Sequence, residues 1–169
     1  LFEQIENGTV QAAQLGGELD TGVAFLPKLS RDAGDRNRTS PFAFSGNKFE
    51  FRALSSGQSI AMPNVALNVA VAESLDYAAT ELEKSLKAGK KLQAAVKDLL
   101  TKIIKENKRI IFNGNNYSRE WEKEAGKRGL LNLKNTVDAL PQLTTKEVVG
   151  VFEKYKVLNE RELHARYEI

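Results

Sequence analysis

The stretch PFAFSGNKFEFR, residues 41–52, has the pattern of a β-hairpin. It begins with apolar and aromatic residues, and the SGNK segment that follows is typical of a turn. The FEFR segment alternates, which places two phenylalanines on one face of a strand and Glu50 and Arg52 on the other. We therefore expect a short antiparallel hairpin at this position.

Beyond residue 62 the apolar residues recur at helical spacing. Helices are predicted at 63–88, 91–111, 118–129 and 145–154, and a last one follows Asn159 as its N-cap. Pro63 suits an early helical position and Gly89 a helix end. Thr144 or Thr145 suits the N-cap of the fourth helix. The first half of the 63–88 helix is apolar nearly all round, so we expect it to be well buried.

The segment before the hairpin is rich in glycine and is predicted to be mostly irregular. Residues 1–6 have the character of a helix end, and residues 23–26 that of a short strand. The sequence thus predicts an α+β fold in two parts. Residues 1–62 carry the hairpin, and residues 63–169 form a mainly helical region.

The composition is ordinary for a soluble globular protein, with 41% hydrophobic and 28% charged residues in 169. The chain has no cysteine, which excludes disulfides and thiolate metal sites and fits a reducing, cytoplasmic environment. No apolar run approaches the length of a membrane span and no signal peptide is visible, so we expect no membrane partner.

A basic cluster at residues 31–38 and a net charge of +3 raise the alternative of a nucleic-acid-binding module. Asp32 and Asp35 interrupt the cluster, and no aromatic residue interleaves it. The sequence therefore favours no nucleic-acid partner.

Charged residues gather in and before the predicted hairpin. They are Arg38, Lys48, Glu50 and Arg52. The last three share one face of the second strand, and Arg38 is expected near that face if the strands pair. Cations around a carboxylate can bind an anion, and the carboxylate suits a hard divalent ion, as phosphoryl transfer requires. Alternating charges on a hairpin are more often a solvated face with weak ion pairs.

Three blocks of the chain resemble class III glutamine synthetases. DRNRTSPFAFSGNKFEFRA at residues 35–53 is nearly identical to a signature of that family. IIKENKRIIFNGNNYSREWEKEAGKRGLLNLKNT at 103–136 is similar to its C-terminal region, as is FEKYKVLNERELHARYEI at 152–169. The blocks follow the family's order and cover most of the chain, which is more specific than one short motif.

The resemblance implies a β-grasp domain followed by a catalytic domain whose curved sheet lines a funnel between subunits. It implies a ligase that transfers the γ-phosphate of ATP to the side-chain carboxylate of glutamate. Ammonia then displaces phosphate to give glutamine. The implied partners are glutamate, ammonia and ATP, with Mg²⁺ or Mn²⁺, and a homo-oligomer of stacked rings, a dodecamer.

Residue by residue, the resemblance implies that Glu50 binds the divalent metal. Arg52 matches the arginine that meets the side-chain carboxylate of glutamate and then the transferring phosphoryl group. Arg38 matches an arginine that contacts substrate and phosphate, and Lys48 stands where a basic residue lies on the ATP side. The other metal ligands and the ammonium site would come from sequence that this chain lacks, so we expect the chain alone to be inactive.

A second interpretation gives the helical region a role in assembly between subunits, without chemistry of its own. It is based on the apolar stripe at residues 92–104 and on the lack of a convergent polar cluster after Arg52. His164, the single histidine, is expected to be a surface or packing residue, because metal sites need several donors. Trp121 is expected to anchor helices to one another.

Overall fold

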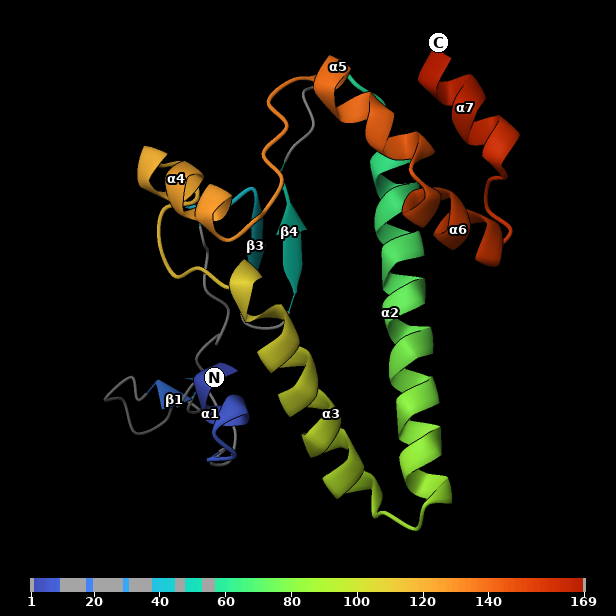
Figure 1. Ribbon diagram of the computed structural model, residues 1–169. Coiled ribbons are helices and arrows are strands. Elements are labelled where there is room, and N and C mark those ends of the chain that lie inside the picture. The colour runs from blue at the N-terminus through green and yellow to red at the C-terminus, as the bar shows by residue number, and fades with distance from the viewer. Residues whose placement is uncertain are drawn as a thin grey trace.

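The structure is a computed structural model that describes residues 2–9, 18–19, 29–30, 38–44, 48–52 and 57–168. Within these ranges, two short antiparallel strand pairs precede a mainly helical region, which is the predicted α+β fold (Figure 1). The strands are β1 (Glu18–Leu19), β2 (Leu29–Ser30), β3 (Phe42–Phe44) and β4 (Phe49–Phe51). The helices are α1 (Phe2–Glu6), α2 (Ala61–Lys87), α3 (Leu92–Asn107), η1 (Lys108–Ile110), α4 (Arg119–Lys127), α5 (Thr136–Ala139), η2 (Leu140–Thr144), α6 (Lys146–Lys154) and α7 (Glu160–Glu168).

The strands of the predicted hairpin are confirmed as β3 and β4. Phe42 pairs with Phe51, and Ala43 pairs with Glu50. Residues that are directly opposite in an antiparallel pair have side chains on the same side of the sheet, so Glu50 shares a side with Ala43. The rings of Phe42 and Phe49 stack on the other side with centroids 5.2 Å apart. The turn at residues 45–47 lies outside the described residues.

Helices α2 and α3 form a long helical hairpin that is closed by the loop around Gly89. Gly89 has a φ of 84°, a left-handed conformation that glycine adopts without strain, and it ends α2 as predicted. Near the loop the helices contact each other, and Lys102 of α3 pairs with Glu81 of α2 at 3.4 Å. Toward the N-terminus of α2 the two helices diverge (Figure 1).

The best-packed core lies where α6 and α7 cover the N-terminal half of α2. Val69, Phe152 and Leu163 form its buried centre, with exposed fractions of 5%, 5% and 0%. Caps hold the two short helices in place. Thr145 accepts a hydrogen bond from the backbone N–H of Val148, and Asn159 accepts one from that of Glu162, so both predicted N-caps are confirmed.

Helix α1 packs on α3 and is tied to it by polar contacts. The hydroxyl of Thr101 donates to the carbonyl of Ile5 at 3.2 Å, which satisfies an acceptor at the end of α1. Lys108 pairs with Glu6 at 2.7 Å. The predicted helical character of residues 1–6 is therefore confirmed for Phe2–Glu6.

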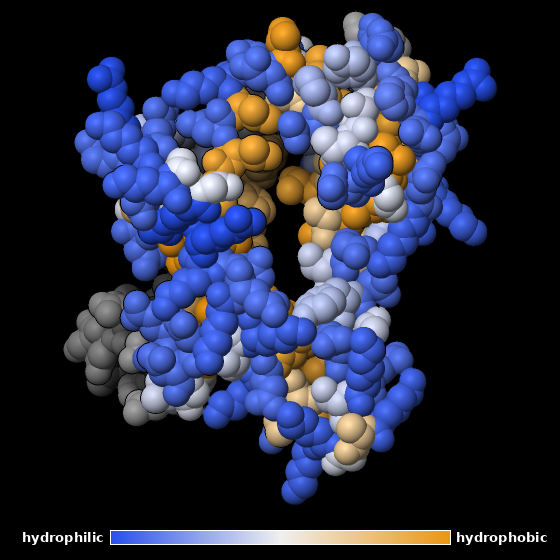
Figure 2. Space-filling model, viewed as in Figure 1, coloured by the Kyte–Doolittle hydropathy of each residue, from blue (hydrophilic) through white to orange (hydrophobic). Residues whose placement is uncertain are grey.

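The expectation that the first half of α2 is well buried is wrong. Val71 is 54% exposed and Leu75 is 65% exposed. The two helices have diverged toward the N-terminus of α2, so α3 does not cover this part of the helix (Figure 1). Figure 2 shows hydrophobic atoms at the rim of the opening between α2 and the arm formed by the hairpin, α3 and α4. Helix α6 packs on another part of α2, around Val65 and Val69.

Other sequence expectations differ in detail. The helix predicted at 91–111 ends at Asn107 and continues as the 3₁₀ turn η1. The short helices α5 and η2 were not predicted, and the strand expected at 23–26 lies outside the described residues. None of the described helices combines the length and apolar character needed to cross a membrane.

Candidate functional site

Three charged side chains of the β4 segment, Lys48, Glu50 and Arg52, lie together and are named here the charged face. The Oε2 atom of Glu50 accepts a hydrogen bond from Nε of Arg52 at 3.2 Å and a second from its Nη2. Nζ of Lys48 lies 3.5 Å from Oε1. The hydrogen bond from Arg52 holds the pKa of the Glu50 carboxyl below its ordinary value, and the charge of Lys48 adds to this effect. Glu50 is therefore ionised at neutral pH.

The charged face is covered in part, at Glu50 and Arg52, while the side chain of Lys48 is 65% exposed. Ala43, which lies opposite Glu50 on this side, is only 1% exposed, and the side chains of Arg52 and Glu50 are 31% and 33% exposed. On the aromatic side, Phe42 and Phe49 are 49% and 60% exposed. The pair of Glu50 and Arg52 is therefore partly covered, whereas Lys48 lies mostly in solvent.

The donor set of the charged face suits an anion better than an isolated metal ion. One carboxylate and two cations leave a net charge of about +1, which attracts phosphate or carboxylate oxygens. Among the described residues, no group of three or more His, Cys, Asp or Glu side chains could hold a metal ion. Glu50 could supply one oxygen-bearing ligand, whereas a divalent ion such as Mg²⁺ needs about six oxygen ligands in all.

Arg38 is exposed and lies before β3, outside the strand ladder. Among the described residues, no hydrogen bond or ion pair joins it to Lys48, Glu50 or Arg52. The structure thus brings together three of the predicted site residues, and the nearness of Arg38 to them stays a prediction. The basic cluster at 31–38 lies almost wholly outside the described residues.

A contact that the sequence did not predict ties the C-terminal half of the chain to the hairpin. The backbone N–H of Asn116 donates to the carbonyl of Thr39 at 2.8 Å. Asn116 lies in the loop FNGNNYS, residues 112–118, for which the sequence predicted only a helix break. The asparagines of this loop were a signal of an ordered turn, because an asparagine side chain can accept a hydrogen bond from the backbone two residues later. In the structure, the Asn115 side chain accepts such a bond from the N–H of Tyr117 at 3.0 Å.

The loop is anchored on α4 by aromatic stacking. The rings of Phe112 and Trp121 stack with centroids 4.3 Å apart, and the guanidinium of Arg128 lies over Trp121 at 5.5 Å. Arg128 also donates to the carbonyl of Ile111 at 2.9 Å. Ser118 caps α4 by accepting the N–H of Trp121 at 3.2 Å. Trp121 is thus an anchor between a helix and a loop, not between two helices as expected.

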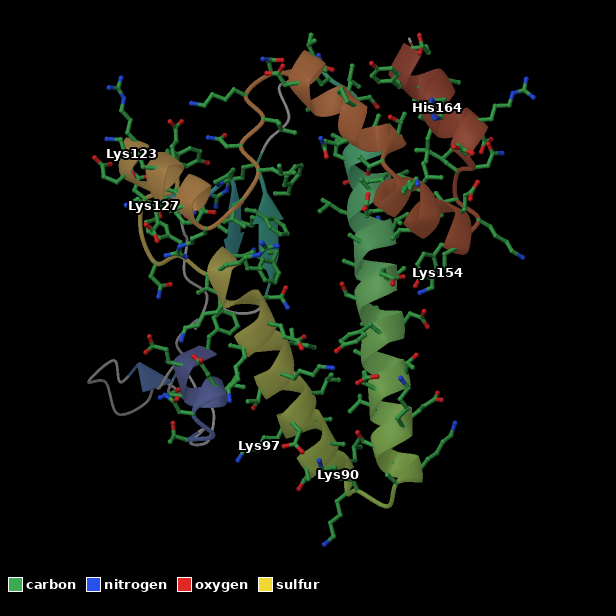
Figure 3. All side chains as sticks on the ribbon, in the orientation of Figure 1. Lys90, Lys97, Lys123, Lys127, Lys154 and His164 are labelled. Atoms are coloured by element: carbon green, nitrogen blue, oxygen red, sulfur yellow. The ribbon has the colours of Figure 1, made fainter. Side chains whose placement is uncertain are left out.

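His164 takes no part in these arrangements. It is exposed on α7, at the far side of the molecule from the hairpin (Figure 3).

Comparison with known proteins places the chain in a family. The family model for the glutamine synthetase C-terminal domain matches residues 95–169. The type-3 glutamine synthetase of Dictyostelium discoideum is 38% identical over 169 residues, which is 100% of this chain and 23% of the relative. The glutamine synthetase of Bacteroides fragilis (strain YCH46) is 37% identical over 151 residues, covering 89% of this chain and 21% of the relative. That of Butyrivibrio fibrisolvens is 39% identical over 142 residues, covering 83% and 20%.

The chain therefore spans between a fifth and a quarter of the length of these relatives, 20–23%. The alignment with the Dictyostelium protein includes the charged face as well as the helical region, because it covers the whole chain. These findings agree with the resemblance in all three blocks of sequence. The chain belongs to the glutamine synthetase family, as a segment that includes the family's C-terminal domain.

Proposed function

We propose that the chain is part of an ATP-dependent glutamate–ammonia ligase, and that its charged face forms one side of the active site. The observation that carries this proposal is the cluster of Lys48, Glu50 and Arg52, in which Glu50 and Arg52 form a partly covered ion pair. It is supported by relatives whose names are glutamine synthetase. In the proposed reaction, the γ-phosphoryl group of ATP passes to the side-chain carboxylate of glutamate, and ammonia then displaces phosphate.

In this proposal, Arg52 and Arg38 act on the negative charge of the reacting groups. A guanidinium can pair with a carboxylate through two parallel hydrogen bonds, so Arg52 would hold and orient the side-chain carboxylate of glutamate. As the phosphoryl group transfers, negative charge spreads over its oxygens, and fixed cations stabilise that charge. Arg38 would contact the same substrate and phosphate oxygens.

Glu50 would contribute one ligand to Mg²⁺ or Mn²⁺, and Lys48 would contact ATP. The metal ion, when bound, offsets the charge of the ATP phosphates. Because the charged face offers a single carboxylate, the remaining metal ligands would come from other parts of the full-length enzyme. For the same reason we propose that this chain is inactive alone.

The same proposal includes three further points. They are the division of the chain at residue 62, the dodecameric assembly of stacked rings and a cytoplasmic location. The division is supported by the change from strand to helical pattern, and α2 begins at Ala61. A cytoplasmic location is supported by the absence of cysteine from the sequence.

Substitutions in a full-length enzyme that carries this segment test the site. Glu50→Ala and Arg52→Ala should each lower glutamine formation by roughly 100-fold or more, because each removes a group that stabilises charge in the transition state. The matched control is Glu83→Ala with Lys87→Ala, a solvated pair at 3.6 Å on α2, which should leave turnover unchanged. Near-normal turnover in either charged-face variant would reject the site assignment.

A second candidate function is assembly by the helical region, favoured by the exposed apolar side chains of α2. Val71 and Leu75 are 54% and 65% exposed, and a neighbouring subunit would bury them. Light scattering of a full-length enzyme truncated after Gly57 tests this role. A loss of the oligomer supports it, and an intact oligomer counts against it.

A further inference from the structure

The backbone that carries Arg38 is not held by the β-ladder. Next to the paired residues of β3 and β4, the N–H of Arg52 donates a backbone hydrogen bond to the carbonyl of Pro41 at 2.7 Å. The carbonyl of Thr39, next to Arg38 in the chain, instead accepts the N–H of Asn116 at 2.8 Å. This bond restrains the backbone next to an exposed arginine, and ordering a backbone residue lowers its conformational entropy.

The donor of this bond sits in a loop with a fixed shape. The stack of Phe112 on Trp121 holds one end of the loop, and the N-cap at Ser118 holds the other. Gly114 lies so close to the Phe112 ring that an added Cβ would come within 2.7 Å of it. The loop therefore presents the Asn116 N–H from a rigid base, and not from a free surface segment.

We propose that the loop at residues 112–118 is a positioning element for Arg38. It fixes the backbone at Thr39 and thereby sets where the guanidinium of Arg38 meets the substrate carboxylate and the transferring phosphoryl group. The loop does not touch the reacting atoms and acts only through Arg38. This inference rests on the proposed function, since it takes Arg38 to contact substrate.

A matched pair of substitutions at one position tests the inference in a full-length enzyme. Asn116→Pro removes the backbone N–H that Thr39 accepts, whereas Asn116→Ala removes the side chain and keeps the N–H. Asn116→Pro should lower kcat/KM for glutamate roughly 10- to 100-fold, the size of loss that a misplacement of about 1 Å causes. Asn116→Ala should remain close to the unaltered enzyme.

A double-mutant cycle with Arg38→Ala separates positioning from a general structural effect. If the loop acts through Arg38, Asn116→Pro should cause no further loss of residual turnover once Arg38 is absent. An equal further loss in the Arg38→Ala background overturns the proposal. So does an equal effect of Asn116→Pro and Asn116→Ala in the unaltered background.

A second variant carries the test if Asn116→Pro does not assemble. Phe112→Leu loosens the base of the loop without touching its backbone, and it should give a smaller loss that also vanishes in the Arg38→Ala background. A Phe112→Leu loss that persists there contradicts the inference. The proposed function has its own contradicting result: near-normal turnover of Glu50→Ala or Arg38→Ala rejects the site itself. If Arg38→Ala is inactive but Asn116→Pro is fully active, only the positioning role is rejected.

Discussion

At the scale of single residues, Gly114 is the position where the loop has no room for a side chain. Gly114→Ala should displace the Phe112 ring from Trp121, because the new Cβ would lie 2.7 Å from two ring atoms. We expect a lower melting temperature and a shift in tryptophan fluorescence, which reports this site because Trp121 is the single tryptophan of the chain. Overpacking of this kind costs about 1–3 kcal/mol of unfolding free energy.

The control for Gly114 lies in the next helix. Gly126 of α4 has open space where a Cβ would be added, so Gly126→Ala should stabilise the chain by about 1 kcal/mol through helix propensity. An unchanged emission spectrum and melting temperature in Gly114→Ala would show that the close approach to Phe112 is not maintained in solution.

The residue scale also shows what the sequence could predict. Strand alternation places Lys48, Glu50 and Arg52 on one face, and the ion pairs confirm that grouping. Alternation has no bearing on Arg38, which lies outside the strands. The bond from Asn116 to Thr39 joins residues far apart in the chain, and a local pattern carries no information about such a contact.

At the scale of elements, α6 is followed by a residue in an unfavourable backbone conformation. Lys156 has a φ of 54°, and it follows α6 with its N–H bonded to the carbonyl of Glu153. Lys156→Gly should raise the free energy of unfolding by up to about 1 kcal/mol, because glycine adopts this conformation without a Cβ penalty. The greater freedom of glycine in the unfolded chain offsets part of the gain.

Urea unfolding of Lys156→Gly beside Lys156→Ala measures this effect. The alanine variant loses the same charge and keeps the Cβ, so it should show no gain. Equal stabilities for the two variants would mean that the left-handed conformation at the end of α6 is not strained.

Helix α6 is also clamped to α2 by a charged cluster (Figure 3). Nζ of Lys154 lies 2.7 Å from Glu73 and 2.8 Å from Asp76, and the hydroxyl of Tyr155 donates to Glu73 at 2.7 Å. The hydrogen bonds from Lys154 and Tyr155 lower the pKa of both carboxyls, while their bonds raise the pKa of Lys154.

The sign of the pH dependence follows from the carboxyls. A group whose pKa is lower in the folded state stabilises the fold above its unfolded pKa, and this contribution disappears as the pH falls through the folded value. Lys154→Met should therefore unfold more easily than the parent chain at pH 7. The difference should shrink as the pH falls through the lowered pKa values of Glu73 and Asp76, because protonation removes the charges that Lys154 pairs with. A stability difference that is constant with pH would show that the clamp acts by packing and not by charge.

Local signals predicted most elements of the helical region. The N-cap at Asn159 was predicted, and Thr145 was one of the two candidates for the N-cap of α6. The helix predicted at 118–129 begins with Ser118 as its N-cap. Helices α5 and η2 were missed because each is too short to show an apolar periodicity, and Pro141 lies within η2.

At the scale of the whole molecule, many large apolar side chains of the described residues are exposed. Leu75, 65% exposed on α2, is the clearest case. Leu75→Lys should hardly change the stability of the chain, because little burial is lost, but it should reduce the oligomer of a full-length enzyme if that surface is covered by a neighbouring subunit. Light scattering measures this, with Thr80→Lys on another side of α2 as the control.

An unchanged mass for Leu75→Lys would rule out this part of α2 as a subunit contact. The sequence predicted that the first half of α2 would be buried, and its periodicity could not show that this chain leaves Leu75 exposed. Helical periodicity shows which residues need cover but does not identify what provides it.

The most direct test of the central claim is a structure of the full-length enzyme with Mn²⁺, glutamate and a non-hydrolysable ATP analogue. We predict an anomalous Mn²⁺ peak bound by the carboxylate of Glu50, with the guanidinium of Arg52 on the side-chain carboxylate of glutamate. Metal and glutamate bound elsewhere, with the pair of Glu50 and Arg52 intact and remote from both, would contradict it.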